Sequence, residues 1–343
     1  MKYRLYFTLD YEIHGNGDGD PRILMVEPTD RLMDVLEKYG QKLTIMADVA
    51  EILSFKRYFS ETGVDKFHVT EIEAQLQDAI RRGHDVQLHI HSSWFRATWN
   101  GKKWDQFIDE YNMAALPLER IDEMVGQCVC YLEKLITPVK PDYKVWLFRA
   151  ANWSMMPTEN IYSVLVKHGI TADTSVFKGG VQGGNVSFDY TDAFHNLLSY
   201  PASSVNINHL APTGQKRIIT EYPIYTEMRP FWAFLSPMRA FRMMRAKFHR
   251  HKKSSVALQD LGKKNNRSLS VGSFFRKSPW KLDFNQATGS QLIAAMKRIR
   301  ELRFSDREAV DVVFIGHSKT FLSYNETSFE KFLKWAATNS LSN

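Results

Sequence analysis

The sequence has 343 residues, of which 44% are hydrophobic, and its 45 Lys and Arg residues outnumber its 38 Asp and Glu residues. This composition excludes a disordered or fibrous chain, and the length allows a large core that needs no disulfide or metal to fold. Two cysteines, Cys128 and Cys130, are too few for a disulfide-stapled secreted domain or a four-thiolate zinc site. No apolar stretch approaches the roughly 18 residues that span a bilayer. We expect a single domain over residues 1–343 in a reducing, cytoplasmic compartment.

Apolar segments typical of buried strands alternate along the chain with amphipathic segments typical of helices. The expected strands cover residues 3–10, 43–46, 85–91, 145–148, 170–175, 217–222 and 310–315, and the expected helices cover 28–39, 70–82, 118–136, 157–168, 292–299 and 326–337. Gly40 ends the first helix, and the capping box Thr70-x-x-Glu73 begins the second. This alternation predicts an α/β fold built from parallel β/α units.

The positive charge is concentrated in residues 229–281. This segment has 14 Lys and Arg residues and one acidic residue, Asp260, whereas the rest of the chain has 31 basic and 37 acidic residues. Apolar and basic side chains recur at helical spacing over 235–248, which is typical of a helix lying on an anionic membrane surface. The alternative is a solvated insertion whose apolar side packs on the domain. No nucleic-acid-binding motif accompanies the charge, so we expect no nucleic-acid partner.

Polar side chains gather where the expected strands end. Asp10 and Glu12 lie at the end of the first strand, and His89 and His91 lie at the end of the third. In parallel β/α folds the carboxyl ends of the strands meet at one mouth, where catalytic residues cluster. Three further polar side chains belong to the fourth, fifth and last strands: Arg149, Asp173 and His317.

The spacing of these residues suits a metal-dependent hydrolase. His89 and His91 are two residues apart, so on a strand both imidazoles project to the same face, and Asp10 and Glu12 repeat that spacing. Two imidazoles and one carboxylate can bind a Zn²⁺-like divalent ion, which leaves the other carboxylate to take a proton from water. The alternative is two hydrogen-bonded histidines at the rim of a barrel.

Five other residues complete the candidate site. Arg149 could orient the base carboxylate and keep it ionised, although an ordinary salt bridge is the alternative. His317 is the candidate general acid for the leaving group. Trp94 and Trp153 are placed either to stack on a sugar ring or to pack in the core. Asp173 is placed either to contact substrate or to hold a turn.

Four segments in order resemble four motifs of the polysaccharide deacetylase superfamily, also called NodB homology or carbohydrate esterase family 4. They are TLDYE at residues 8–12, GHDVQLHIHSSW at 83–94, FRAANW at 148–153 and FIGH at 314–317. The resemblance runs from about residue 3 to 320, with 229–281 as an insertion. Within the superfamily the chain is most similar to a divergent branch associated with O-antigen and capsule polysaccharide biosynthesis.

The resemblance implies a distorted (β/α)₇ barrel that removes N- or O-acetyl groups from sugars with Zn²⁺ or a similar ion. It implies that Asp10 is the catalytic base, that His89 is the first metal histidine, that Arg149 holds the base and that His317 is the catalytic acid.

The sequence departs from the family pattern at two places. The family has two adjacent aspartates in its first motif, whereas here Tyr11 separates Asp10 from Glu12. This leaves open which of the two carboxylates binds the metal. The second histidine of the family lies four residues after the first, where this chain has Ser93, so His91 must take that role.

The expected function is a metal-dependent deacetylase acting on a sugar of a cell-surface polysaccharide or its lipid-linked precursor, with peripheral contact at the inner face of the membrane through 229–281. One alternative is a hydrolase on the same scaffold that cleaves a non-sugar or cyclic amide. Another is a degenerate carbohydrate-binding protein that has lost turnover.

Overall fold

The computed structural model describes residues 2–230, 277–302, 304 and 308–341. Its centre is an eight-stranded sheet with the strand order β10-β11-β7-β6-β3-β2-β1-β14. Within this sheet only β10, against β11, is antiparallel. The strands are β1 (Lys2–Tyr11), β2 (Leu43–Asp48), β3 (Asp85–Ile90), β6 (Leu147–Ala150), β7 (Ala172–Asp173), β10 (Tyr200–Pro201), β11 (Thr220–Glu221) and β14 (Ala309–His317).

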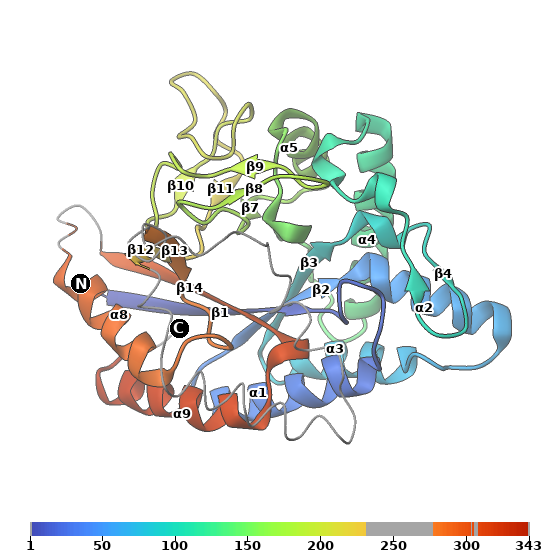
Figure 1. Ribbon diagram of the computed structural model, residues 1–343, viewed down its shortest axis with the longest axis horizontal. Coiled ribbons are helices and arrows are strands. Elements are labelled where there is room, and N and C mark those ends of the chain that lie inside the picture. The colour runs from blue at the N-terminus through green and yellow to red at the C-terminus, as the bar shows by residue number, and fades with distance from the viewer. Residues whose placement is uncertain (1, 231–276, 303, 305–307, 342–343) are drawn as a thin grey trace, which may run out of the picture.

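Helices flank the sheet, and Figure 1 shows them around the outside of its curve. Neighbouring helices contact one another, for example α8 with α9, α9 with α1, and α3 with α4. The helices are α1 (Glu27–Glu37), α2 (Val49–Thr62), α3 (Val69–Arg81), α4 (Leu118–Ile136), α5 (Thr158–Lys167), α8 (Gly289–Glu301) and α9 (Ser323–Thr338). Three two-stranded ribbons lie outside the main sheet: β4 (Thr98–Trp99) with β5 (Trp104–Asp105), β8 (Val181–Gln182) with β9 (Phe188–Asp189), and β12 (Thr226–Pro230) with β13 (Lys277–Lys281).

Irregular backbone contacts connect the two sides of the curved sheet. Beyond β11, the amide of Ile224 donates to the carbonyl of Val176 at 2.9 Å, and the amide of Tyr225 donates to the carbonyl of Val313 in β14 at 3.3 Å. The sheet therefore curls toward closure through single bridges instead of a full ladder. The expected α/β fold is confirmed, in a form consistent with the distorted NodB-like barrel.

The alternation of side chains along β1 separates the core from the barrel interior. Phe7 is fully buried, and its ring lies 5.4 Å from that of Phe329 in α9, so this side of the strand faces the helices. Thr8 and Asp10 point the other way, and both contact Arg149 of β6. The apolar side of the strand therefore fixes the polar side toward the interior.

The start of α3 differs from the sequence prediction. The helix begins at Val69, and its N-cap His68 provides no side-chain cap, so the predicted capping box at Thr70 and Glu73 is wrong. The carboxylate of Asp65 instead accepts the amides of Val69 and Thr70, at 2.7 and 3.0 Å. The free backbone amides of the first turn of α3 are thus satisfied by Asp65, which lies upstream of the predicted capping box.

Helix α2 was not expected from the sequence, and two predicted strands are shorter than expected. Asp48 ends β2 and caps α2 by accepting the amide of Glu51, so strand and helix follow each other without a loop. Of the strand expected over 170–175, only β7 is regular strand, and of the strand expected over 217–222, only β11 is.

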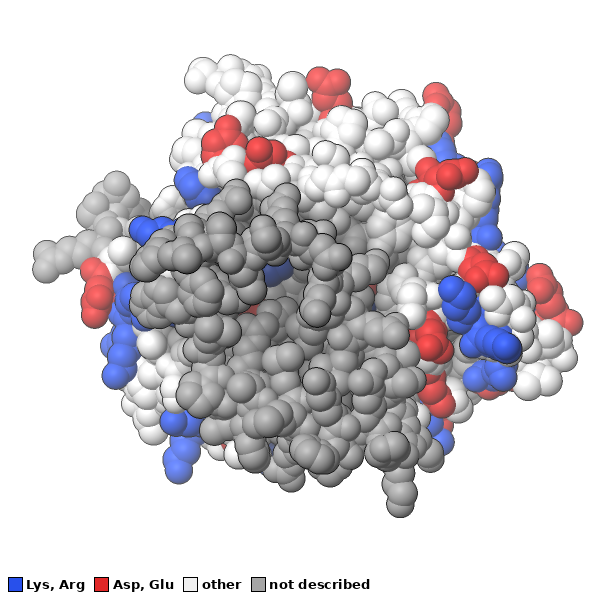
Figure 2. Space-filling view, viewed as in Figure 1, with Lys and Arg blue, Asp and Glu red and all other residues white. Residues whose placement is uncertain are grey.

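Most of the basic segment falls outside the described residues. Residues 231–276 are not described, so the amphipathic helix predicted there lies outside the structure, while both ends of the segment form the β12–β13 ribbon. Among the described residues, no helix has the length and apolar character needed to cross a membrane. Figure 2 shows basic and acidic side chains interspersed around the described part of one face.

We expect Gly316→Ala to lower the free energy of unfolding by about 1–3 kcal/mol, the usual cost of overpacking. An added Cβ would lie 2.1 Å from a ring carbon of Phe284 and 2.5 Å from Oδ1 of Asn285. Denaturant unfolding measures the loss. Gly183→Ala is the matched control, because no atom lies within 4 Å of its added Cβ. Equal stability of the two variants would contradict this packing.

Candidate active site and metal centre

Strand register brings the candidate residues together at one end of the sheet. Asp10 of β1 is paired with His317 of β14, and His89 of β3 is paired with Arg149 of β6. Between these two pairs, Asp48 of β2 is paired with His89. Parallel strands that end at the same level present their terminal side chains to one mouth, as the sequence predicts.

Glu12, His89 and His91 form a buried cluster with the donor set of a metal site. One ligand atom from each residue lies within 4.8 Å of the other two. Oε2 of Glu12 lies 2.8 Å from Nε2 of His91 and 3.6 Å from Nε2 of His89. One carboxylate and two imidazoles are common ligands of catalytic zinc, which keeps a further position for water or substrate.

The hydrogen bonding of His89 supports this assignment. Its Nδ1 lies 2.8 Å from the carbonyl oxygen of Arg149, an acceptor, so Nδ1 must carry the proton that is donated. Its Nε2 is buried and has no hydrogen-bond partner among the described residues. A metal-binding histidine typically donates one ring N–H to a carbonyl and binds the metal through its other ring nitrogen. His89 has this arrangement, with Nε2 available to a metal. The residues therefore fit a divalent ion.

Charge around Glu12 keeps this carboxylate ionised. Burial alone would raise its pKa, but Lys319 and His91 lower it well below the usual range. Nζ of Lys319 lies 2.8 Å from Oε1 of Glu12, which leaves Oε2 to the histidines. Burial lowers the pKa of His89, yet the neighbouring carboxylates of Glu12 and Asp10 raise it to about 9. A metal ion would therefore displace a proton from this cluster.

Arg149 holds Asp10 from inside the barrel. The guanidinium is fully buried and donates to Oδ1 of Asp10 at 2.6 Å, to Oγ1 of Thr8 at 2.7 Å and to the carbonyl of Thr174 at 3.0 Å. Burial raises the pKa of Asp10, but Arg149 together with His89 and His317 outweighs this effect, and the net pKa is lowered. Asp10 is thus ionised and fixed in orientation.

His317 lies on the other side of Asp10. Its Nε2 is 3.4 Å from Oδ2 of Asp10, and its backbone amide donates to Oδ1 of Asn285 at 2.7 Å. Burial lowers the pKa of His317 even though Asp10 opposes this effect. The side chain keeps 18% of its surface exposed, so an incoming group can reach it.

Asp173 lies behind Arg149 and is fully buried. Its carboxylate accepts the amide and the hydroxyl of Ser175, both at 2.9 Å. The neighbouring Glu221, also fully buried, has a pKa raised well above its usual range by burial and by Asp173. This placement favours the turn-holding role of Asp173 and does not support direct contact with substrate.

The two tryptophans of the candidate site have different surroundings. Trp153 is half-buried, and its ring centroid lies 6.2 Å from that of His317 in an edge-to-face arrangement. Trp94 is 2% exposed and packs at 5.6 Å against both Phe55 and Trp104. A sugar ring cannot stack on a side chain this buried, so the structure supports the core alternative for Trp94.

Several charged residues of the site were missed at the sequence level. Lys319 is two residues beyond His317, and the spacing rule that joined Asp10 to Glu12 could have pointed to it. Asp48 ends a strand as Asp10 does, and its burial raises its pKa. Nothing in the local sequence marks Glu221 or Lys281, because distant segments bring them to the mouth.

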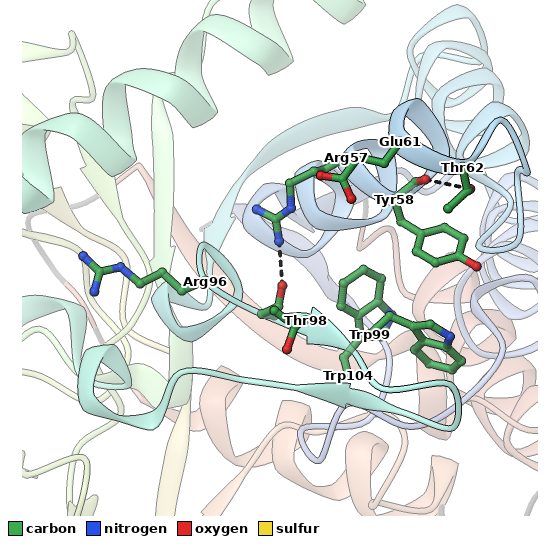
Figure 3. A pocket seen from close by; sticks show the side chains of 9 residues that line it. Arg57, Tyr58, Glu61, Thr62, Arg96, Thr98, Trp99 and Trp104 are labelled. Carbon is green, nitrogen blue, oxygen red and sulfur yellow. Dashed lines mark hydrogen bonds between the residues drawn. The ribbon is translucent and has the colours of Figure 1, made fainter.

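A cavity of about 420 Å³ lies elsewhere, between α2 and the β4–β5 ribbon. Figure 3 shows the Tyr58, Trp99 and Trp104 rings gathered at one side of it, with Arg96 toward the other. Trp104 also packs against Trp94, so the cavity borders the aromatic core that follows β3. None of the sequence-predicted site residues lines it.

Comparisons with known proteins agree with the fold. No protein-family model and no curated protein matches the sequence. A 4-alpha-glucanotransferase from Thermococcus litoralis is 13% identical with a TM-score of 0.50, over 100% of this chain and 39% of its own. A candidate polysaccharide deacetylase from Mycobacterium smegmatis is 10% identical with a TM-score of 0.48, over 99% of this chain and 86% of its own. An allantoinase is 10% identical with a TM-score of 0.48, covering 99% and 85% of the two chains. At such identities the likeness concerns the fold alone.

We expect the purified protein to bind a divalent ion through Glu12, His89 and His91. Replacing a ligand, as in Glu12→Gln or His91→Asn, should weaken Zn²⁺ binding by more than the roughly 10–100-fold that loss of an outer-shell partner costs. Titration calorimetry on chelator-treated protein measures the affinity.

His209→Asn is the control for this experiment, because His209 is an exposed histidine whose side chain keeps 52% of its surface accessible. If Glu12→Gln and His91→Asn bind Zn²⁺ as tightly as the native protein and the His209→Asn control do, the site is rejected.

Proposed function

We propose that the protein is a metal-dependent deacetylase that removes an acetyl group from a sugar of a cell-surface polysaccharide or its lipid-linked precursor. The observation that carries this proposal is the meeting of two units at one mouth. One is the metal-ligand cluster of Glu12, His89 and His91, and the other is the Asp10–His317 pair held by Arg149. The four sequence motifs that resemble polysaccharide deacetylases support a sugar substrate.

A divalent ion held by Glu12, His89 and His91 would polarise the acetyl carbonyl and lower the pKa of water. The residues beside the cluster handle the protons. Asp10 is the general base, because Arg149 keeps its carboxylate ionised and aimed into the mouth. The histidine–carbonyl bond from His89 to Arg149 keeps the ligand cluster and the base in a fixed relation.

His317 is the general acid that protonates the departing amine or hydroxyl. It lies beside Asp10 at 3.4 Å, so the base and the acid flank the same point of the mouth. Its lowered pKa makes the protonated ring a stronger proton donor than an ordinary imidazolium. The bond from its amide to Asn285 fixes the backbone that carries it.

The proposal places the enzyme in the cytoplasm, in peripheral contact with an anionic membrane surface through residues 229–281. What supports this contact is the charge of that segment, with 14 basic residues and one acidic residue. Such a surface would present a lipid-linked, phosphate-bearing precursor close to the mouth.

We expect metal-loaded protein to release acetate from acetylated sugars. Asp10→Asn and His317→Ala should each lower kcat by about 10²–10⁴-fold, the usual contribution of a general base or acid. Enzymatic detection of acetate over a panel of N- and O-acetyl sugars measures this. Asp192→Asn is the control, because this carboxylate is 73% exposed and lies outside the candidate site.

Cyclic amides added to this panel, together with a measurement of sugar binding, separate the alternatives. Opening of cyclic amides without acetate release would replace the deacetylase by a hydrolase of another substrate class. Sugar binding without any turnover, unchanged in His317→Ala, would indicate a degenerate carbohydrate-binding protein.

A further inference from the structure

Lys281, the last residue of β13, lies in the mouth beside the catalytic pair. Its Nζ is 3.5 Å from the ring centroid of Trp153 and 4.3 Å from that of Phe177. The Trp153 ring in turn stands 6.2 Å from His317. The backbone directly after Lys281 is bonded to β14, where the amide of Ile315 donates to the carbonyl of Leu282 at 3.0 Å. Lys281 is therefore anchored to the strand that carries His317.

Two cations of this mouth are held in ion pairs, whereas the ammonium of Lys281 is in none among the described residues. Arg149 is paired with Asp10, and Lys319 is paired with Glu12. Lys281 forms no ion pair or hydrogen bond with any described residue, and two aromatic faces are its close partners. Asp283 and Asp10 are near enough to influence this ammonium, but neither is in ion-pair contact with it, so its donors are open to a ligand.

The surroundings make this ammonium a strong attractor for an anion. Burial lowers its pKa to about 8, although Asp283 and Asp10 act to raise it, so the group stays largely charged at neutral pH. Cation–π contacts offset part of the cost of removing an ammonium from water. An anion that reaches it interacts in a medium less polar than water, where a charge-assisted hydrogen bond is strengthened.

Trp153 can contribute a second donor. Its indole Nε1 is buried and has no hydrogen-bond partner among the described residues. Its carbonyl oxygen accepts the hydroxyl of Tyr190, and its ring packs edge-to-face on Phe177 at 5.4 Å, which positions the ring beside Lys281. A buried N–H without a partner is uncommon in native proteins and is expected at a binding position.

We propose that Lys281, with Trp153 and Phe177, forms an anion-binding subsite that receives a carboxylate or phosphate group carried by the acetylated sugar. This inference rests on the proposed function and narrows its substrate class from acetylated sugars in general to anionic ones. The subsite lies beside His317, on the side of the mouth formed by β13, and is separate from the metal-ligand cluster.

Equilibrium binding tests the subsite without any turnover. Calorimetry on the full chain compares N-acetylglucosamine with its 6-phosphate and with the corresponding N-acetylglucosaminuronic acid, so that phosphate and carboxylate are distinguished. We expect at least one anionic sugar to bind about tenfold or more tightly than the neutral sugar, as a charge-assisted bond implies. The titrations are repeated on chelated protein, because a bound cation would attract the same anions.

Variants assign the preference to Lys281. Lys281→Gln should abolish it, and Lys281→Arg should retain it because the charge and the cation–π contact remain. Lys277→Gln is the matched control, since Lys277 lies on the same strand and is exposed. If Lys281→Gln does not fold, Lys281→Met replaces it, and in the native protein the preference should weaken as ionic strength rises.

An equal affinity for neutral and anionic sugars, or a preference that survives in the glutamine variant, would overturn the subsite. The acetate-release assay is read separately. Anion preference that depends on Lys281 without acetate release would keep the subsite and reject the deacetylase. Acetate release without such a preference would keep the deacetylase and reject the subsite.

Discussion

A fully buried guanidinium organises the mouth of the barrel. Arg149 donates to Asp10 and Thr8 of β1, and its own carbonyl accepts the Nδ1 proton of His89 from β3. One residue thus sets the ionisation of the base with its side chain and the tautomer of a metal ligand with its backbone. A buried arginine is tolerated only when its donors are paired, so the three strands must keep their register for the charge to stay satisfied.

The same requirement links the core to the chemistry. In the second half of β1, Phe7 and Leu9 are fully buried, and they alternate with Thr8 and Asp10, which face the interior and contact Arg149. A shift of the strand by one residue would turn Asp10 into the helix layer and leave Arg149 without its partner. Packing of the outer layer therefore holds the geometry of the site, although none of those apolar side chains touches it.

The sequence predicts the parts of this arrangement that depend on local periodicity. The alternation of strands and helices predicted the α/β class, and the ends of the strands predicted the positions of Asp10, His89 and Arg149 at one mouth. Features that depend on distant contacts were not predictable in this way. Trp94 was open to two interpretations until α2 supplied Phe55 as its packing partner. Lys281 reaches the site only because the backbone after β13 joins β14.

Two departures from the motif pattern that the sequence resembles fit each other in space. Glu12 lies two residues beyond Asp10, and His91 lies two residues beyond His89, on neighbouring parts of the same mouth. Glu12 comes one residue later than the second carboxylate of the pattern, and His91 comes two residues earlier than its second histidine. The 2.8 Å contact between Glu12 and His91 shows that the displaced groups still meet. Lys319 lies two residues beyond His317, and its ammonium pairs with the carboxylate of Glu12. The cluster therefore keeps its donor set while Asp10 remains bound to Arg149, which favours Glu12 as the metal ligand and Asp10 as the base.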